Sequence, residues 1–555
     1  MRAIHSAISV AFLSLPVEGS VAIGSTDPTL FLRCATLKPR TMSPVTLALI
    51  LVLLGLLAYR YLWKTTNFFK ERGIEHPPTV PIFGNIAPVL FRRVYMGYYL
   101  RDLYNRYSHL KYFGFFNFMS PLIVIRDPEL ISSIAMKNFD HFTDHLGFVD
   151  SDIDPLFGKN LFSLRGDHWR EMRKLLSPSF TSAKMKNMFK LIVDCADSFS
   201  GFIAEEAKNG RIYDLKDLFR RYTNDVVATT NFGIAVDSMR NPDNEFYTFG
   251  RETINFASTK MNLKFLIGRN FPTLSKLFRI RIFDEKATQF FKKVVTETVR
   301  MRKEKGIVRP DMIQLMMEST DTQGNHLSID DMTIQAFVFF LAGFDTSASL
   351  MCLATHMIAT HEEVREKVLA EIEEVHNKLE GRQPTYEAIR DMQYLDAVLD
   401  ETGRMYPVVQ FLDRVCVKDF ELPPAAPGAK PVKMKPGDQV WFLPPGLHYD
   451  PKYFSDPDTF KPERFLNEHI PQTVYIPFGV GPRICIGNRF ALMETKVMLY
   501  YLLKRCVIEP CAKTTVPLEF NKALIQPVPK TGFWLKFKTR NDYSTANGHV
   551  PNGTA

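Results

Sequence analysis

A short segment near the C-terminus, residues 478–487, reads FGVGPRICIG and carries one cysteine, Cys485. A cysteine sulfur that accepts backbone N–H hydrogen bonds must lie in a tight loop, and glycines let the backbone come close to it. Gly481 and Gly487 bracket Cys485 in this way. An apolar helical pattern follows over residues 488–502. This spacing is typical of a thiolate ligand to haem iron, which pushes electron density onto the metal and favours O–O cleavage.

Two neighbours of Cys485 fit the same interpretation. Arg483 is placed to reach a haem propionate, and Phe478 is placed to pack over the proximal face and keep water from the sulfur. The alternative is a buried free cysteine in a glycine-rich turn, because free cysteines are usually structural. Five spaced positions favour the metal ligand over that alternative.

A second group of residues that are able to do chemistry lies in the middle of a long apolar stretch. Ser328–Asp331 has the pattern of a capped helix start, and apolar residues continue to Ile358. Residues 342–347 read AGFDTS, and the mid-helix glycine costs about 1 kcal/mol relative to alanine. Thr346 is able to divert a backbone hydrogen bond, and a hydroxyl beside the Asp345 carboxylate is suited to proton delivery. The alternative is a polar notch in a core helix.

Two further pairs are expected to support these groups. Trp169 and Arg173 lie four residues apart on one helical face, and their N–H donors suit a carboxylate such as a haem propionate. Glu401 and Arg404 form an E-x-x-R pair, a spacing that recurs at three other places in the chain. Only this pair precedes an extended region that leads to Arg464, so we expect a buried triad with a structural role.

Composition excludes several classes of protein. The 555-residue chain has a net charge of +9, but its basic residues are dispersed, and this argues against nucleic acid as a partner. The seven cysteines are odd in number and scattered, and they contain no CxxC pair. We therefore expect no disulfide framework and place the catalytic part in a reducing compartment.

The N-terminal part has the pattern of a membrane anchor. Within residues 42–63, the stretch 45–62 is almost wholly apolar, is about as long as a bilayer-spanning helix requires, and ends in aromatic and basic residues. A basic, proline-rich linker follows over residues 64–81, which places the C-terminal bulk on the cytosolic side. Residues 1–41 weakly resemble a targeting peptide, but Met42 would make a sensible start, and we favour an alternative start. We expect one large domain over residues 82–540 and a disordered tail over residues 541–555.

Taken together and in this order, the motifs resemble a cytochrome P450, and they are similar to its family-3 group and the thromboxane-synthase relatives. The segments that carry the finer likeness are residues 175–182, 341–346, 413–419 and 490–493. The resemblance implies a mainly α-helical domain with a small β-rich lobe, in addition to the N-terminal transmembrane helix. It also implies haem b (iron protoporphyrin IX) between two long helices, and electrons from NADPH through a reductase.

The resemblance assigns roles to individual residues. Cys485 would be the axial ligand, and Trp169, Arg173, Arg414 and Arg483 would contact the haem propionates. Two positions depart from the family pattern: Gly403 stands where relatives usually have leucine, and His145 stands where family-3 chains often have a propionate-binding arginine. Segments that by resemblance border the substrate pocket contribute Phe142, Phe148, Phe337, Phe340, Ala342 and Phe411.

The leading hypothesis is monooxygenation of lipophilic small molecules such as xenobiotics, steroids or other lipids. The implied partners are NADPH–cytochrome P450 reductase, cytochrome b5 and the lipid bilayer. The expected location is the endoplasmic reticulum membrane, with the mitochondrion as the alternative. Two other functions stay open: a haem-thiolate isomerase of lipid peroxides, and a non-catalytic, membrane-tethered haem- or ligand-binding protein. The Asp345–Thr346 pair argues against the isomerase, because isomerisation needs no proton delivery.

Overall fold

The computed structural model describes residues 67–540 apart from 148, 209, 255–258 and 321–323, together with seven isolated positions between 44 and 55. Most of the expected anchor over residues 42–63 lies outside the described residues, and so do all of residues 1–41 and 541–555. Leu62–Ala555 forms one compact unit, and the description below concerns that unit.

Helices dominate the chain, as predicted. In the first half they are α3 (Ala87–Leu90), α4 (Met96–Arg106), α5 (Pro128–Ser132), α6 (Pro155–Gly158), α7 (Gly166–Leu176), α8 (Ser182–Glu206), α9 (Leu215–Val227), α10 (Glu245–Thr253), α11 (Thr259–Asn270) and α12 (Pro272–Leu277). In the second half they are α13 (Glu285–Lys305), α14 (Met312–Glu318), α15 (Ile329–Thr360), α16 (Glu362–Lys378), α17 (Tyr386–Arg390), α18 (Gln393–Met405), α19 (Pro444–Leu447), α20 (Arg464–Asn467) and α21 (Asn488–Arg505).

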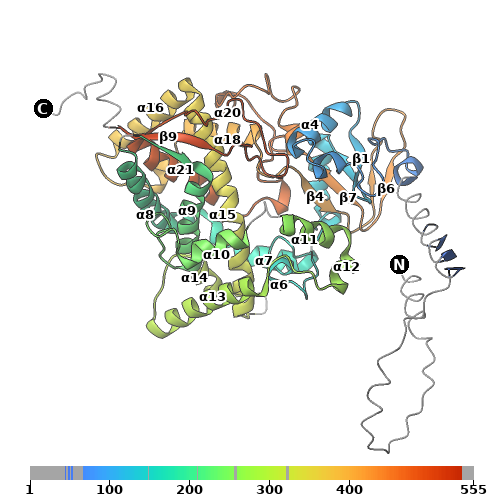
Figure 1. The fold of residues 1–555 in the computed structure, drawn as a ribbon, viewed down its shortest axis with the longest axis horizontal. Coiled ribbons are helices and arrows are strands. Elements are labelled where there is room, and N and C mark those ends of the chain that lie inside the picture. The colour runs from blue at the N-terminus through green and yellow to red at the C-terminus, as the bar shows by residue number, and fades with distance from the viewer. Residues whose placement is uncertain are drawn as a thin grey trace, which may run out of the picture. The chain divides into compact units, whose positions relative to one another are not determined.

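The strands form small sheets, and this confirms the prediction of a mainly helical chain with a β-rich lobe. They are β1 (Tyr112–Asn117), β2 (Ser120–Ile125), β3 (Arg211–Asp214), β4 (Leu412–Val415), β5 (Phe420–Leu422), β6 (Val432–Met434), β7 (Gln439–Phe442), β8 (Cys506–Glu509) and β9 (Trp534–Thr539). The sheets have the orders β1-β2-β7-β4, β3-β9-β8 and β5-β6. Figure 1 shows the sheet of β1, β4 and β7 on the far side of α15 from α8.

Helix α15 is the central element of the fold. The hydroxyl of Ser328 caps it by accepting a hydrogen bond from the N–H of Asp331 at 3.0 Å, as the sequence predicted. Among the described residues, α15 is the one helix that is long and apolar enough to cross a bilayer, but most of its apolar window is buried inside the protein. It is therefore a core helix.

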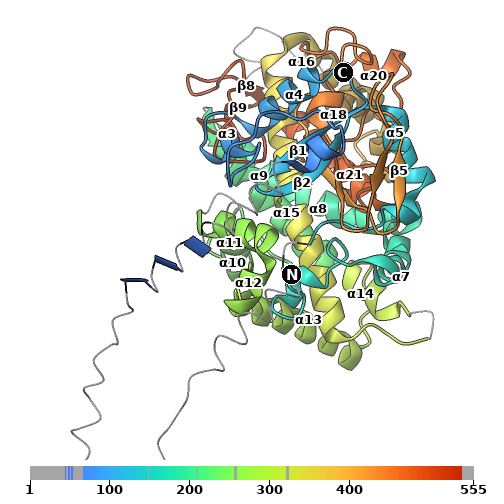
Figure 2. The ribbon, with the colours of Figure 1, turned by 90° about the vertical axis from the view of Figure 1, so that its right-hand side faces the viewer.

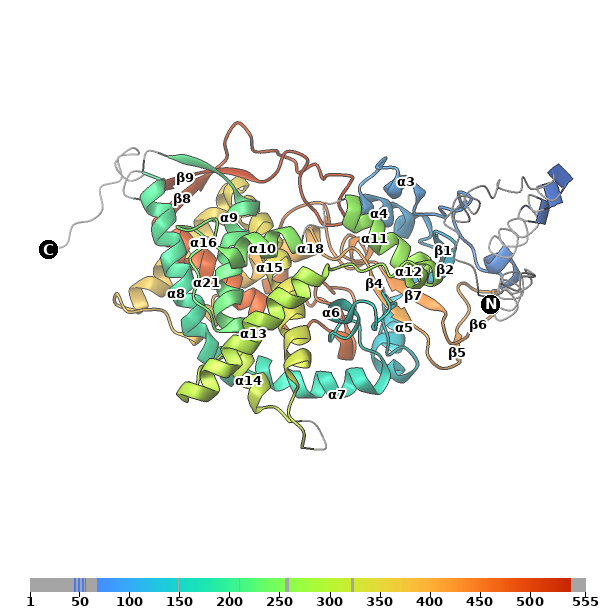
Figure 3. The same ribbon diagram turned by 60° about the horizontal axis from the view of Figure 1, so that its bottom comes forward.

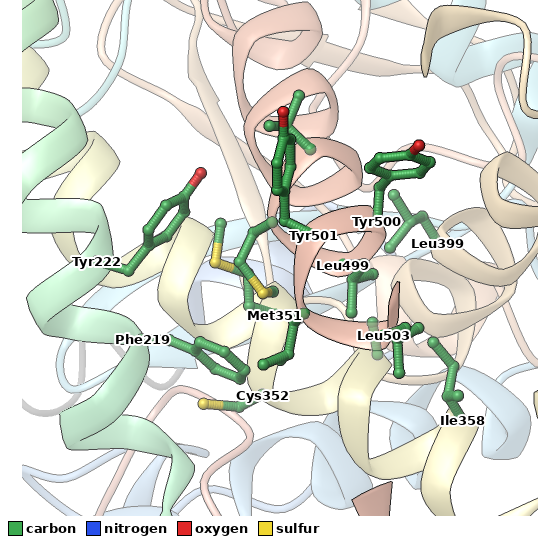
Figure 4. Packing of buried hydrophobic residues seen from close by; sticks show 14 of the residues in the cluster. Phe219, Tyr222, Met351, Cys352, Ile358, Leu399, Leu499, Tyr500, Tyr501 and Leu503 are labelled. Atoms are coloured by element: carbon green, nitrogen blue, oxygen red, sulfur yellow. The ribbon is translucent and has the colours of Figure 1, made fainter. Parts of the chain in front are cut away.

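The largest hydrophobic cluster packs α15 against its neighbours. Figure 4 shows Phe219 and Tyr222 of α9 facing Met351 and Cys352 of α15, with side chains of α21 and α18 closing the other side. All of these cluster residues are buried. The packing joins α8 and α9 to α15, α18 and α21. It so holds α21, which follows the cysteine segment, beside α15, which carries the AGFDTS segment.

A second cluster lies under the β1-β2-β7-β4 sheet. It includes Phe69 and Ile74, which are buried although they belong to the segment expected to be a linker. A Cβ atom at Gly114 of β1 would lie 2.7 Å from the Phe69 ring, so the two residues pack tightly. The segment over residues 64–81 therefore contributes core residues, and the core begins before residue 82.

Helices α7 and α10 to α13 lie in other regions of the fold. Figure 2 shows α10, α11, α12 and α13 gathered in one region of the fold, away from α16. Figure 3 shows α7 along one edge, apart from the layer of α8, α9 and α21. Helix α7 carries the predicted Trp169–Arg173 pair.

Leu499 provides a test of the central packing. It has no exposed surface, so replacing it with alanine is expected to leave a cavity and to lower the free energy of unfolding by about 2–5 kcal/mol. Chemical unfolding followed by circular dichroism measures this change. Leu466, which is 45% exposed on α20, is the matched control, and Leu466→Ala is expected to change the free energy by about 0.5 kcal/mol or less. Equal losses in the two variants would contradict the assignment of the core.

Candidate haem-thiolate site

The cysteine segment forms a closed loop before α21. The N–H of Cys485 donates to the carbonyl of Phe478 at 2.8 Å, which folds the loop back on itself. Gly481 has φ +72°, and a Cβ atom there would collide with the carbonyl of Ala135, so only glycine fits. Gly487 has ordinary backbone geometry, but its backbone hydrogen bond stabilises the negatively charged form of Cys485.

The Cys485 side chain is exposed although protein atoms crowd around it. Burial raises the pKa of its thiol, while the Gly487 hydrogen bond and the charge of Arg173 act in the opposite direction. An accessible sulfur with a built-in donor and a nearby cation is the arrangement that a metal-bound thiolate requires, because the metal completes the removal of the proton.

Three guanidinium groups cluster around the loop of Cys485. Arg173 donates to the carbonyl of Ile484 at 2.9 Å, Arg414 donates to that of Val480 at 3.1 Å, and Arg483 donates to that of Thr143 at 2.8 Å. Burial and the charges of Arg414 and Arg173 lower the pKa of Arg483 to about 9, although the charges of Asp144 and Asp413 act in the opposite direction. Burial also lowers the pKa of Arg414 to about 10. An anion among these groups would relieve the repulsion.

The donors that remain in this cluster fit a haem with its propionates. The Nε atom of Arg414 is buried and has no hydrogen-bond acceptor in the described structure. The Arg483 guanidinium lies 4.0 Å from the centre of the Trp169 ring, so the four residues predicted to contact propionates lie close to one another and to the Cys485 loop. A buried, unsatisfied cationic donor beside an accessible thiol matches a flat group that carries both carboxylates and a metal.

His145 takes a different role from the arginine that often stands at this position in family-3 chains. Its Nδ1 lies 3.1 Å from Oδ1 of Asp413, and its ring stacks on Phe162 with the centroids 4.8 Å apart. Burial lowers the pKa of His145, so the ring is neutral at physiological pH. His145 therefore binds a protein carboxylate and supplies no fixed positive charge.

The AGFDTS segment lies in the middle of α15. The Thr346 hydroxyl donates to the carbonyl of Ala342, as expected for a diverted helix hydrogen bond. Ala342 and Thr346, one turn apart, are partly or fully accessible, while the residues that follow are buried. Gly343 has a packing role as well, since a Cβ atom there would lie 3.0 Å from Val227 of α9.

Asp345 points toward α9. Its Oδ1 lies 3.0 Å from Nζ of Lys216 and 2.6 Å from Nη2 of Arg220. Burial acts to raise the pKa of this carboxyl, but the charges of Lys216 and Arg220 outweigh it and hold the pKa below its usual value. Asp345 is thus ionised and held by two cations, and it would have to leave them to exchange protons beside Thr346.

The structure brings Glu401, Arg404 and Arg464 together as a fully buried triad. Arg404 donates to both carboxylate oxygens of Glu401 at 2.7 and 2.8 Å, and Arg464 Nε donates to Oε1 at 3.1 Å. The backbone N–H of Lys461 adds a fourth hydrogen bond at 2.9 Å. Every contact of Glu401 is therefore with protein, which agrees with a structural role.

The predicted pocket residues divide into two groups. Phe142, Phe337 and Phe340 have no exposed surface, so they belong to the aromatic core and line no open space, contrary to expectation. Ala342 and Phe411 are accessible, and Phe411 stacks on Trp441 with the centroids 4.1 Å apart. Phe148 lies outside the described residues.

Sequence reasoning missed a buried acid on α21. Glu494 is fully buried and neither of its carboxyl oxygens has a hydrogen bond of normal geometry, although Ser347 beside Thr346 interacts with it. Burial raises the pKa of Glu494 from its usual 4.5 to about 8, so the group is protonated at neutral pH. The available signal was an acidic residue inside an otherwise apolar helical pattern.

The chain resembles characterised families over most of its length. Residues 75–534 match the family named Cytochrome P450. Cytochrome P450 9e2 of Blattella germanica is 42% identical over 87% of this chain and 96% of its own length. Cytochrome P450 9b2 of Drosophila melanogaster is 36% identical over 90% of this chain and 100% of its own length. Cytochrome P450 6j1 of Blattella germanica is 34% identical over 87% of this chain and 95% of its own length.

Glu494 gives a pH-dependent prediction. Between its unfolded value near 4.5 and its folded value near 8, the folded state holds a proton that the unfolded state has released, so this carboxyl makes stability fall as pH rises. The variant Glu494→Gln is expected to lose that part of the decline. Unfolding midpoints measured from pH 5 to pH 8 test this expectation, and an unchanged slope in the variant would contradict the assignment of a neutral Glu494.

Proposed function

Since the chain belongs to the cytochrome P450 family and is a monooxygenase of that family, we propose that it inserts one atom of O2 into lipophilic small molecules, with electrons from NADPH through a reductase. The observation that carries the proposal is the accessible Cys485 sulfur beside the Gly487 hydrogen bond and Arg173. When bound, the haem supplies the iron at which O2 is reduced and cleaved.

The residues around Cys485 hold the cofactor in this proposal. Cys485 is the axial ligand, and Phe478 and Gly487 keep its loop closed and its charge stabilised. The cationic cluster of Arg173, Arg414 and Arg483 binds the propionates, with the Trp169 ring packed beneath Arg483. The triad of Glu401, Arg404 and Arg464 keeps the surrounding backbone in place, and it takes no part in the chemistry.

The distal helix manages protons in this proposal. Thr346 presents a hydroxyl on the accessible face of α15, where it orients water and passes a proton. Asp345 is the partner of Thr346 when it exchanges Lys216 and Arg220 for water. Ala342, one turn before Thr346, is exposed, so this face of α15 is accessible to water.

The proposed substrate class and location are supported by an accessible apolar surface on and beside α11 and α12. Leu263, Phe271, Leu274, Leu277 and Phe278 on and beside α11 and α12 are between 41% and 74% exposed. Such a patch suits contact with a lipid surface, through which lipophilic substrates reach the site. We place the protein in the endoplasmic reticulum membrane with residues 42–63 as its anchor.

The electron donor in this proposal is NADPH–cytochrome P450 reductase, with cytochrome b5 as an additional partner. Lys174 of α7 is exposed and suits an acidic partner surface, whereas Arg170 already pairs with Asp140 and Asp167. The identity to Cytochrome P450 9e2 and Cytochrome P450 6j1 supports membership of a family-3-like group.

The ligand is tested with Cys485→Ser. The variant is expected to lose the thiolate-type spectrum of the reduced carbon-monoxide complex and all NADPH-dependent product formation, because a serine hydroxyl does not replace the thiolate. The control is Cys352→Ser, since Cys352 is buried in the hydrophobic core cluster that joins α9, α15 and α21. A thiolate-type spectrum in Cys485→Ser would overturn the assignment.

Proton delivery is tested with Thr346→Ala. The variant is expected to keep its spectrum and its NADPH consumption but to form at least about tenfold less product per NADPH, because protons no longer reach the distal side in order. The ratio of product to NADPH for a lipophilic substrate measures this uncoupling. Thr360→Ala is the matched control, since Thr360 makes the same type of hydrogen bond, to the carbonyl of His356, at the C-terminal end of α15. Equal ratios in the two variants would contradict the role of Thr346.

A further inference from the structure

A buried histidine, His448, connects α18 to the cysteine segment. His448 directly follows α19 and has no exposed surface. Its Nδ1 lies 3.1 Å from the carbonyl oxygen of Arg404, and its Nε2 lies 3.0 Å from the backbone nitrogen of Ile476. Arg404 Nη1 also donates to the carbonyl of His448 at 2.8 Å, so the two residues are joined twice.

These contacts fix the protonation of the ring. A backbone N–H only donates, so Nε2 must carry a lone pair to accept from Ile476, and the ring proton must be on Nδ1, where it donates to Arg404. Burial and the charge of Arg404 lower the pKa of His448 to about 3, which agrees with a neutral ring. Each ring nitrogen therefore has one partner of the right kind.

Ile476 leads directly into the loop of Cys485. Its carbonyl accepts the N–H of Gly479 at 3.1 Å, and the carbonyl of Phe478 between them accepts the N–H of Cys485 at 2.8 Å. On the other side, the Tyr475 hydroxyl donates to the carbonyl of Asp400 on α18 at 2.9 Å. Two consecutive residues before the loop are thus held by α18, one of them through His448.

We propose that His448 is a positioning residue that fixes the Cys485 sulfur by tying the N–H of Ile476 to the carbonyl of Arg404. The proposal deepens the proposed function and rests on it, since it takes Cys485 as the iron ligand. Without the ring, the buried N–H of Ile476 loses its acceptor and the start of the loop is free to shift. The expected consequence is a weaker hold on the thiolate rather than a general loss of folding.

His356 of α15 offers a matched control. It is also a buried histidine whose pKa burial lowers, in this case to about 4, and its Nδ1 has no hydrogen-bond partner in the described structure. It packs beside Phe533, whose ring centroid is 6.2 Å away, and has no contact with the cysteine segment among those described. Loss of either ring removes similar buried volume, but only His448 is tied to the loop.

The experiment compares His448→Leu, His448→Asn, His448→Gln and His356→Leu in the full-length, haem-loaded protein. The readouts are the rate at which the thiolate-type carbon-monoxide spectrum converts to the protonated-thiol type, and the thermal unfolding midpoint. We expect His448→Leu and His448→Asn to convert several-fold faster than wild type, because neither presents an acceptor at the position of Nε2. His448→Gln is expected to stay near the wild-type rate, because its amide oxygen reaches that position. His356→Leu is expected to lower the midpoint without changing the rate.

The possible results separate this inference from the proposed function. If His448→Leu does not accumulate, the comparison of the Asn and Gln variants decides, since each keeps one of the two hydrogen bonds. Equal conversion rates in those two variants, or in His448→Leu and His356→Leu, overturn the role of His448 and leave the ligand assignment intact. A wild-type protein without a thiolate-type spectrum overturns both.

Discussion

The burial of three charged side chains, Glu401, Arg404 and Arg464, is the constraint on which the proximal side depends. A charge without water is tolerated only when hydrogen bonds replace that water, and removal of one partner typically costs about 3–5 kcal/mol. The two arginines therefore use their remaining donors on backbone carbonyls, including those of Ser455 and Pro457. These hydrogen bonds hold the segment between α19 and α20 against α18. They thereby help to position the backbone that precedes Cys485.

Two buried carboxyl groups, Asp345 on α15 and Glu494 on α21, are in opposite protonation states. Asp345 faces the cations of α9 and is ionised, whereas Glu494 faces apolar surroundings and the Ser347 hydroxyl and keeps its proton. Their environments set the difference, since one is compensated by charge and the other is not. The accessible Thr346 directly follows Asp345 on α15 and directly precedes Ser347, the residue that interacts with Glu494.

The parts of the site that could be predicted from the sequence are those whose residues lie a few positions apart. The Cys485 loop, the capped helix with its AGFDTS segment, and the Glu401–Arg404 pair all follow from residues a few positions apart. The partners of Asp345 come from more than a hundred residues away, so no spacing pointed to Lys216 or Arg220. The prediction of the pocket-lining phenylalanines failed for a different reason. A phenylalanine in a core and one at a cavity wall look the same in sequence, and only the packing of the folded chain distinguishes them.

The tight contact between Phe69 and Gly114 has a practical side. A soluble form made by removing the hydrophobic N-terminus must keep the chain from Phe69 onward, because a cut at residue 82 would strip an aromatic ring and Ile74 from beneath the β1-β2-β7-β4 sheet. The segment that carries Phe69 and Ile74 is therefore part of the folded domain, since both side chains are buried in its core.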